Sequence, residues 1–318
     1  MIDSLSAYIG PAAGVFTSLL WTFTSLFFTA AGRRIGPTVV NAYRIGLAIV
    51  LLGLTHRLLS GQWLPAANSR QVLLLAASGL VGLTIGDQAL FSSFLHIGPR
   101  LAMLLMTTSP LFAALFGAVA LDERLGGWAW LGMFLVIGGV AWVVLERPAR
   151  QSLATVENAR RGRGIALATL AAACQAGGLL LSKQGMGHGW LPPEQRLGPQ
   201  AATLVRMTFA GAGMVPVLLL HLRRAGRHRP PRRYGSRRAG FLLATCGAVV
   251  GPFLGVWMSL VASDRAPLGI AQTLCSLPPI FILPFAAVLH KEHISLRAAL
   301  GAAVAVGGAA VLFFNSGG

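Results

Sequence analysis

Residues 98–124 read GPRLAMLLMTTSPLFAALFGAVALDER, and residues 266–293 read APLGIAQTLCSLPPIFILPFAAVLHKEH. Each stretch has proline as its second residue, is apolar for most of its length and carries another proline eleven residues after the first. A helix needs about twenty mostly apolar residues to cross the hydrocarbon core of a membrane. The two stretches therefore predict a pair of equivalent membrane spans, each interrupted by proline.

Other residues place the two stretches in a longer internal repeat. The offset between matched positions rises from 162 to 169 along the chain, as small loop insertions require. Five matches in register indicate a duplicated unit, which has to be recognised before any site is named. The matches are Arg44 with Arg206, Pro99 with Pro267, Pro110 with Pro278, Glu123 with Glu292, and Gly138–Gly139 with Gly307–Gly308.

The composition and the apolar runs predict an all-α membrane protein of about ten transmembrane helices. Of the 318 residues, 55% are hydrophobic and 11% charged, whereas a soluble domain carries about 25% charged residues. We expect spans near 9–31, 37–59, 71–95, 99–121, 126–145, 164–186, 199–221, 239–262, 267–289 and 295–314. The domains are a first repeat (1–147), a basic linker (148–163) and a second repeat (164–318). Because five spans is an odd number, the two five-helix repeats are inverted in the membrane.

The net charge of +17 does not indicate a nucleic-acid partner. The basic residues lie mostly in short segments between apolar runs, eight arginines between residues 222 and 239 alone. A nucleic-acid site would instead gather them on one folded face beside aromatic residues. Loop arginines set the orientation of a membrane protein, and their distribution places both termini outside. The three cysteines lie inside apolar runs, so we expect no disulfide and no metal site.

Several motifs resemble those of a known transporter family: Gly86–Asp87–Gln88, Gly98–Pro99–Arg100, Ser109–Pro110, Leu121–Asp122–Glu123–Arg124 and Gly138–Gly139. With them the chain resembles two tandem units of the EamA-type transporters of the drug/metabolite transporter superfamily. The resemblance implies transport of a small-molecule substrate, often export, through a central cavity in a multi-pass protein of the cell (inner) membrane. It implies no cofactor, and it usually places both termini inside, against the charge distribution. The second repeat departs from the pattern, with Gly251–Pro252 where Gly86–Asp87 stands in the first.

Three charged residues lie well inside the predicted spans, away from their ends, where burial is costly and indicates function. Asp87 and Arg44 come from consecutive antiparallel helices at similar depth, so we predict an ion pair. The pair either fixes helix register or makes Asp87 the proton-coupling group. Arg206 has no matching acid in its repeat. It either attracts an anionic group of the substrate or extends toward a membrane face.

Pro110 and Pro278 remove backbone hydrogen bonds to the carbonyls of Met106 and Leu274. Interrupted helices at matching places in two repeats indicate a binding region, although such kinks also serve packing alone. The candidate cavity residues are Trp21, Gln88, Thr107, Thr108, Ser109, Pro110, Gln175, Arg206, Trp257, Gln272, Thr273, Ser276 and Pro278. The Gly pairs of the fifth and tenth spans predict close helix contact.

These features favour a secondary transporter of small organic metabolites that works by alternating access. A lipid or glycolipid flippase on the same scaffold is the alternative. An enzyme acting on lipid-linked substrates is less favoured, since we find no catalytic constellation in the sequence and assign no catalytic residue. The sequence specifies neither the substrate nor the coupling ion nor the oligomeric state.

Overall fold

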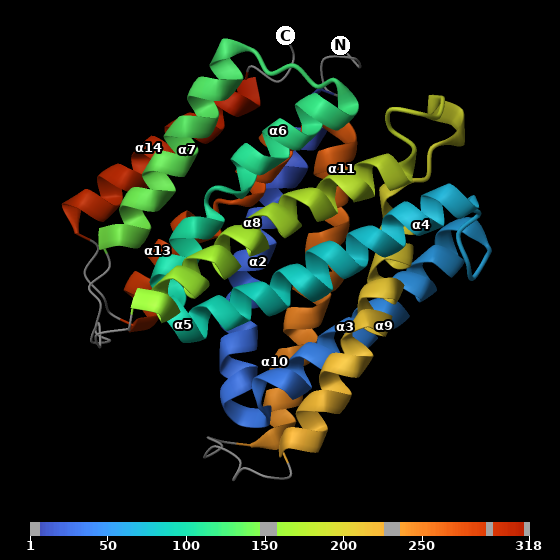
Figure 1. The fold of residues 1–318 in the computed structure, drawn as a ribbon, viewed down its shortest axis with the longest axis horizontal. Coiled ribbons are helices and arrows are strands. Elements are labelled where there is room, and N and C mark those ends of the chain that lie inside the picture. The colour runs from blue at the N-terminus through green and yellow to red at the C-terminus, as the bar shows by residue number, and fades with distance from the viewer. Residues whose placement is uncertain (1–6, 147–157, 226–235, 291–294, 315–318) are drawn as a thin grey trace.

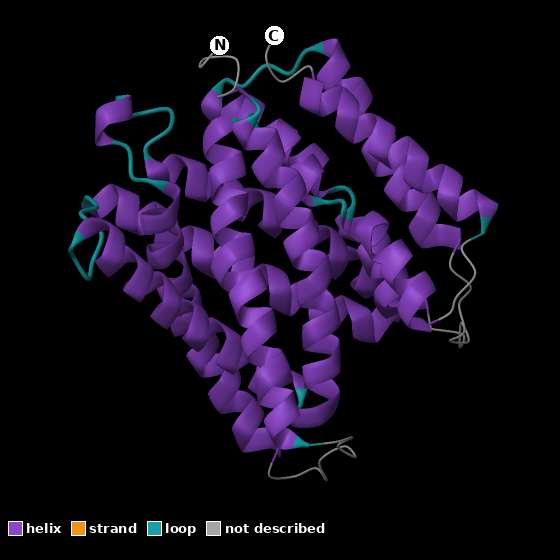
Figure 2. Cartoon of the chain, turned by 180° about the vertical axis from the view of Figure 1, so that it is seen from behind, coloured by secondary structure: helices purple, strands orange, loops and turns teal. Residues whose placement is uncertain are grey.

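The computed structural model describes residues 7–146, 158–225, 236–290 and 295–314. This part of the chain is helical with short loops and contains no strand (Figure 2). Ten of its segments are long and apolar enough to cross a membrane. The predicted number of spans and the all-α membrane fold are thereby confirmed.

Each repeat contains five spans, and the third and eighth spans are each built from three segments. The first repeat consists of α2 (Ile9–Ile35), α3 (Pro37–Ser60), α4 (Ser69–Ser78), η1 (Gly79–Gly86), α5 (Asp87–Met106), α6 (Ser109–Leu121) and α7 (Gly127–Glu146). The second consists of α8 (Asn158–Met186), η2 (Pro193–Gln195), α9 (Pro199–Ala225), α10 (Arg237–Ala248), η3 (Val249–Gly255), α11 (Val256–Arg265), α12 (Leu268–Cys275), α13 (Pro278–His290) and α14 (Leu296–Phe314).

The helices pair across the repeats in a pattern that does not change when the repeats are exchanged. Helix α3 packs on α9 and α7 on α14, each on its own counterpart (Figure 1). Helix α6 of the fourth span packs on α12 of the ninth. Helix α2 packs on α10, η3 and α11, and its counterpart α8 packs in the same way on α4, η1 and α5. This is the pattern that a twofold axis between the repeats produces, and five spans per repeat make the second one inverted.

The start of α2 and the end of α14 lie at the same end of the bundle, which we call the terminal face. There the ring of Tyr8 stacks on that of Phe313 with their centroids 5.2 Å apart. Following the spans in order, α6, α8 and α11 end at this face and α12 begins there (Figure 1). Residues from both repeats therefore meet at the terminal face.

The third and eighth spans contain π-helical segments, η1 and η3, at matching places in the two repeats. Such segments are rare and are often found at functional sites. Both end at glycine, which aligns Gly86 with Gly255 and therefore Asp87 with Val256. The sequence comparison had placed Pro252 opposite Asp87; the π segments shift that match by four residues, and the second repeat still has no acid there.

The fourth and ninth spans are interrupted where the prolines predict. Helix α5 ends before Thr107 and α6 begins at Ser109, while α12 ends at Cys275 and α13 begins at Pro278. Because Pro278 cannot donate a backbone hydrogen bond, the sequence suggested that the Leu274 carbonyl is free to bind a ligand. It is not free, because the Ser18 hydroxyl of α2 donates to it at 2.5 Å. The same hydroxyl oxygen accepts the Leu277 amide at 3.2 Å, so the first repeat satisfies the backbone of a break in the second.

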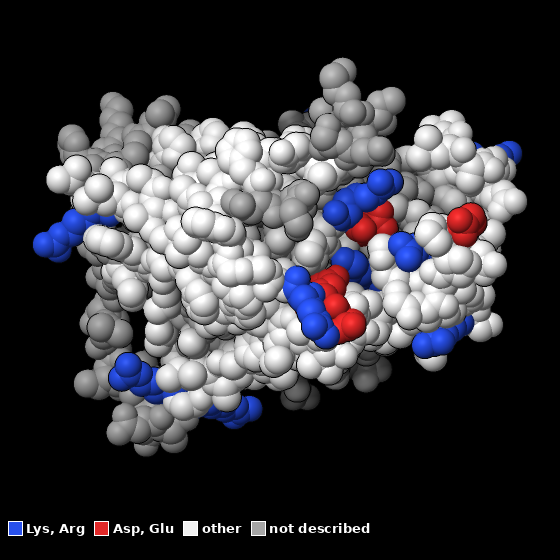
Figure 3. All heavy atoms as spheres, turned by 90° about the horizontal axis from the view of Figure 1, so that it is seen from above, with Lys and Arg blue, Asp and Glu red and all other residues white. Residues whose placement is uncertain are grey.

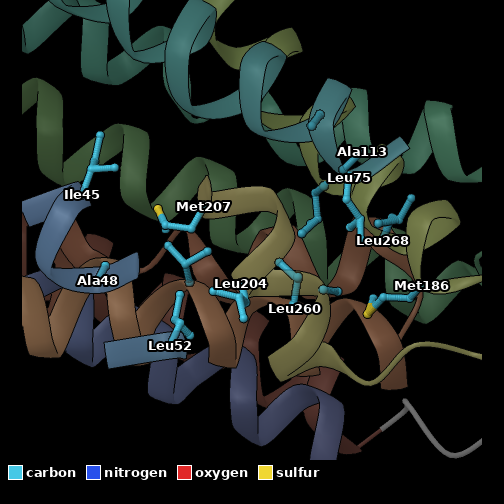
Figure 4. Close-up of a cluster of buried hydrophobic side chains, with 14 residues drawn as sticks. Ile45, Ala48, Leu52, Leu75, Ala113, Met186, Leu204, Met207, Leu260 and Leu268 are labelled. Atoms are coloured by element: carbon cyan, nitrogen blue, oxygen red, sulfur yellow. The ribbon is translucent and has the colours of Figure 1, made fainter. Parts of the chain in front are cut away.

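A buried apolar cluster lies between the repeats and includes residues of both. Ile45, Leu52 and Leu75 of the first repeat are grouped with Leu204 and Leu260 of the second (Figure 4). Lipid tails are as apolar as these side chains, so close van der Waals packing rather than the hydrophobic effect stabilises such a cluster in a membrane. Dense packing at this cluster fixes how the two repeats fit together.

The Gly pairs of α7 and α14 each contain one contact glycine and one glycine with open space beside it. A Cβ added at Gly139 would lie 2.5 Å from the carbonyl oxygen of Gly301, and one at Gly308 would lie 2.7 Å from that of Gly132. Nothing lies within 4 Å of a Cβ added at Gly138 or Gly307. Close backbone approach of this kind is typical of helix pairs in membranes.

We predict that Gly139→Ala lowers the thermal unfolding midpoint of the purified protein by several degrees, because α7 and α14 must separate to admit the methyl group. Gly138→Ala is the matched control and should leave the midpoint unchanged or slightly raised, since alanine favours helix. Equal effects of the two substitutions in detergent unfolding curves would contradict the close contact.

Candidate functional site

A small cavity lies within the bundle and is lined from both repeats. Four lining residues are among those predicted from sequence, and four are not. The space available to water centres is about 20 Å³, which corresponds to about one water molecule. The lining consists of Trp21 of α2, Leu83 of η1, Gln175 and Leu179 of α8, Arg206 of α9, Val256 and Ser259 of α11, and Gln272 of α12.

Arg206 supplies the charge of this cavity. Its side chain is only 3% exposed, so it lies within the protein rather than extending to a membrane face. Of the buried side-chain nitrogens and oxygens in the described residues, only Nε of Arg206 lacks a hydrogen-bond partner. A desolvated donor without a partner is costly, and a guanidinium suits carboxylate and phosphate groups. The site is therefore incomplete without a water or an anionic ligand.

The η1 segment makes room for Arg206. A Cβ added at Gly82 would lie 2.9 Å from Nη2 of Arg206, and one at Gly79 would collide with the Arg206 carbonyl oxygen. On the other side, a Cβ at Gly178 of α8 would lie 2.8 Å from the Cα of Gly82. Three spans thus approach one another closely enough to enclose the guanidinium only because these positions are glycine.

Arg44 and Asp87 lie together, outside the cavity lining. Nη2 of Arg44 is 3.2 Å from Oδ2 of Asp87, and Nε of Arg44 donates to Oδ1 of Asn41 at 2.6 Å. The Arg44 guanidinium also lies 5.4 Å from the ring centroid of Phe28. At the matching place in the second repeat, Arg206 and Val256 both line the cavity. The first arginine is therefore paired with an acid, whereas its counterpart faces a cavity.

The two interrupted spans meet at Gln272, whose Nε2 donates to the Ser109 hydroxyl at 3.2 Å. The other hydroxyls at the breaks donate to carbonyls of their own helices, so they do not offer their protons to a ligand: Thr107, Thr108, Thr273 and Ser276. Pro110 is buried and Pro278 half-buried beside them. The breaks therefore contribute mainly Gln272 to the cavity.

Two other predicted residues do not line this cavity. Gln88 is exposed, because it follows Asp87 by one position and a helix turns by about 100° per residue. The half-buried Trp257 lies beside Phe253, with ring centroids 6.1 Å apart.

The sequence pattern of the EamA-like transporter family matches residues 8–145 and again residues 162–314. The chain belongs to the EamA-like transporter family. One matching crystal structure superposes on this transporter with a TM-score of 0.74, covering 95% of both chains at 19% sequence identity. No curated protein gives a significant match to its sequence.

Sequence reasoning did not single out two charged side chains of this EamA-like transporter that are shielded from water, Lys183 and Glu123. Lys183 is 6% exposed, and its Nζ lies 2.7 Å from Oε1 of Glu123. Sequence reasoning therefore missed an ion pair between the repeats that is shielded from water near the end of α8. The signal that could have found Lys183 is that it precedes the end of α8 by three residues, within an uninterrupted helical run. Leu83, Leu179 and Val256 carry no signal that separates them from other apolar residues.

We predict that the Arg44–Asp87 pair contributes a coupling energy of about 1–2 kcal/mol in a double-mutant cycle. Asp87→Asn and Arg44→Met should each lower the unfolding midpoint of the transporter, because each leaves one charge or donor without its partner. The double variant should lose less than the two single losses added together. Additive losses would show that the two side chains do not interact in the folded protein.

Proposed function

We propose that this EamA-like transporter is a secondary transporter that carries a small organic metabolite by alternating access. The observation behind this proposal is the cavity, which is lined from both repeats and has room for about one water. A metabolite is larger, so it can occupy this place only when the two repeats separate. Inverted repeats around such a site support movement of one repeat against the other.

We further propose that transport is export across the cell (inner) membrane, which is what the family resemblance supports. Helices α7 and α9 end, and α8 and α10 begin, at the face opposite the terminal face, and the described arginines at these helix starts are Arg161, Arg163, Arg237 and Arg238. The positive-inside rule then supports a cytoplasmic location for that opposite face. The substrate would enter there and leave at the terminal face.

We propose that the substrate carries a carboxylate or phosphate group that binds Arg206. The buried Nε without a partner supports an anionic ligand, and the planar guanidinium can donate two parallel hydrogen bonds to such a group. Gln175 and Gln272 lie in the same lining and offer amides for a second polar group, while Trp21 offers an aromatic face. These neighbours favour a small organic anion over an inorganic one.

We predict that anionic metabolites raise the unfolding midpoint of the wild-type protein in a screen of amino acids, nucleobases and organic acids. Arg206→Ala should abolish this stabilisation, and Arg206→Lys should weaken it by about tenfold or more in apparent affinity, because lysine cannot reproduce the bidentate geometry. The exposed Arg297 of α14 provides the matched control, and Arg297→Ala should retain full stabilisation. Retained affinity in Arg206→Ala would exclude this assignment.

The same compounds should be taken up by proteoliposomes that contain the transporter. If labelled lipids crossed the bilayer of these proteoliposomes while no soluble compound did, the flippase alternative would replace the present proposal.

Asp87 is our proposed proton-coupling group. It is paired with Arg44, and protonation would remove the charge that holds Arg44 in place. We predict that Asp87→Asn loses uptake driven by a pH gradient but keeps exchange of labelled for unlabelled substrate, since exchange needs no net proton movement. Glu194→Gln, at an exposed acid of η2, is the control. Unchanged pH-driven uptake in Asp87→Asn would remove this residue from the coupling mechanism.

A further inference from the structure

Buried charges from both repeats gather at the terminal face. Figure 3 views the molecule from this side and shows acidic and basic side chains side by side near the centre of the view, with further basic groups toward its edges. Lys183 of α8 pairs with Glu123, which follows α6, at 2.7 Å, and their side chains are only 8% and 14% exposed. Removing one partner of a pair so shielded from water leaves an uncompensated charge, which is costly. It joins the second repeat to the first.

Glu123 contacts two helices of the second repeat at the terminal face, α8 and α12. Its Oε1 accepts from Lys183 of α8, and its Oε2 accepts the Leu268 amide at the start of α12 at 2.7 Å. Lys183 in turn donates to the carbonyl oxygen of Ala266, between α11 and α12, at 2.7 Å. Nearby, Nε2 of His188 lies 2.8 Å from Oδ1 of Asp264 and ties the segment after α8 to α11.

The local chain is shaped to hold the Glu123 carboxylate in place. Asp122 has a φ of 54°, a left-handed conformation that aspartate tolerates better than most residues. The chain therefore reverses after α6, and the Glu123 amide donates to the Gly117 carbonyl at 3.1 Å. A Cβ added at Gly117 would lie 2.5 Å from Oε2 of Glu123. Glycine at this position leaves the space that the carboxylate occupies.

The charged cluster lies about one helical turn from the cavity along three spans. Leu179 and Gln272 line the cavity, and each is four residues, or about 6 Å, from the cluster residue on its own helix, Lys183 and Leu268 respectively. On α11, Ser259 lines the cavity five residues before Asp264. The cluster therefore lies between the cavity and the terminal face.

We propose that Glu123 and Lys183 form a latch between the repeats that closes the cavity toward the terminal face and must open for substrate to pass there. The inference rests on the proposed alternating access. Charged groups suit such a contact because they are stable in two states: paired when the path is dry, and hydrated when it is open. An apolar closure would instead expose apolar surface to water at each cycle.

The latch can be tested by the accessibility of the cavity to water, without a substrate. Ser259→Cys, in a background in which Cys174, Cys246 and Cys275 are replaced by alanine, places one thiol in the lining. A membrane-impermeant methanethiosulfonate reagent should label it slowly in proteoliposomes while the latch is intact. Adding Glu123→Gln should raise the labelling rate at least fivefold from the terminal face, because the amide cannot pair with the Lys183 ammonium. A protease-cleavable tag fused to Gly318 identifies that face.

Asp122→Asn is the matched control, because Asp122 adjoins Glu123, is 88% exposed in its side chain and leaves the latch intact. Lys183→Met removes the opposite charge and should give the same increase, and an unfolding curve for each variant shows that it is folded. If folded variants at either position were labelled no faster than the control, the latch would be refuted while alternating access could still stand. Faster labelling together with no solute uptake by the wild type would instead contradict the proposed function.

Discussion

The hydrophobic effect does not drive the two repeats together in the membrane, because their apolar side chains can contact equally apolar lipid tails when the repeats are apart. The repeats are instead joined where backbones approach closely and where buried polar groups find partners. Glycines bring α7 against α14 and η1 against α8 and α9. Ser18 satisfies the break between α12 and α13, and Gln272 bonds to Ser109. Such contacts depend on direction, so they are compatible with only a few relative arrangements of the two repeats.

The same constraint accounts for the state of the cavity. With the repeats in close contact, the polar lining contains about one water and encloses an arginine whose Nε has no partner. The surrounding helices cannot move closer to the Arg206 guanidinium without breaking the close glycine contacts around it. The protein therefore keeps a desolvated donor at the centre of the bundle, where an anion could bind it.

The two repeats differ in the charged residues at equivalent positions. Arg44 has Asp87, whereas its counterpart Arg206 has Val256 beside it and faces the cavity. Two equivalent arginines therefore differ in chemistry: the charge of Arg44 is balanced by Asp87, and Arg206 faces the cavity, where it can bind a ligand. The ion pair of Glu123 and Lys183 crosses between the repeats at the terminal face.

The sequence by itself determined the number of spans, the repeat and the places of the helix breaks. These follow from the length of apolar runs and from the chemistry of proline and glycine, which act within a few residues along the chain. The tertiary structure alone decided that Arg206 turns into the cavity and Gln88 away from it, that Gly139 rather than Gly138 is the contact residue, and that Lys183 is buried with Glu123. A helix turns by about 100° per residue, so an error of one or two positions in register exchanges a buried side chain for an exposed one, and only packing against other helices fixes that register.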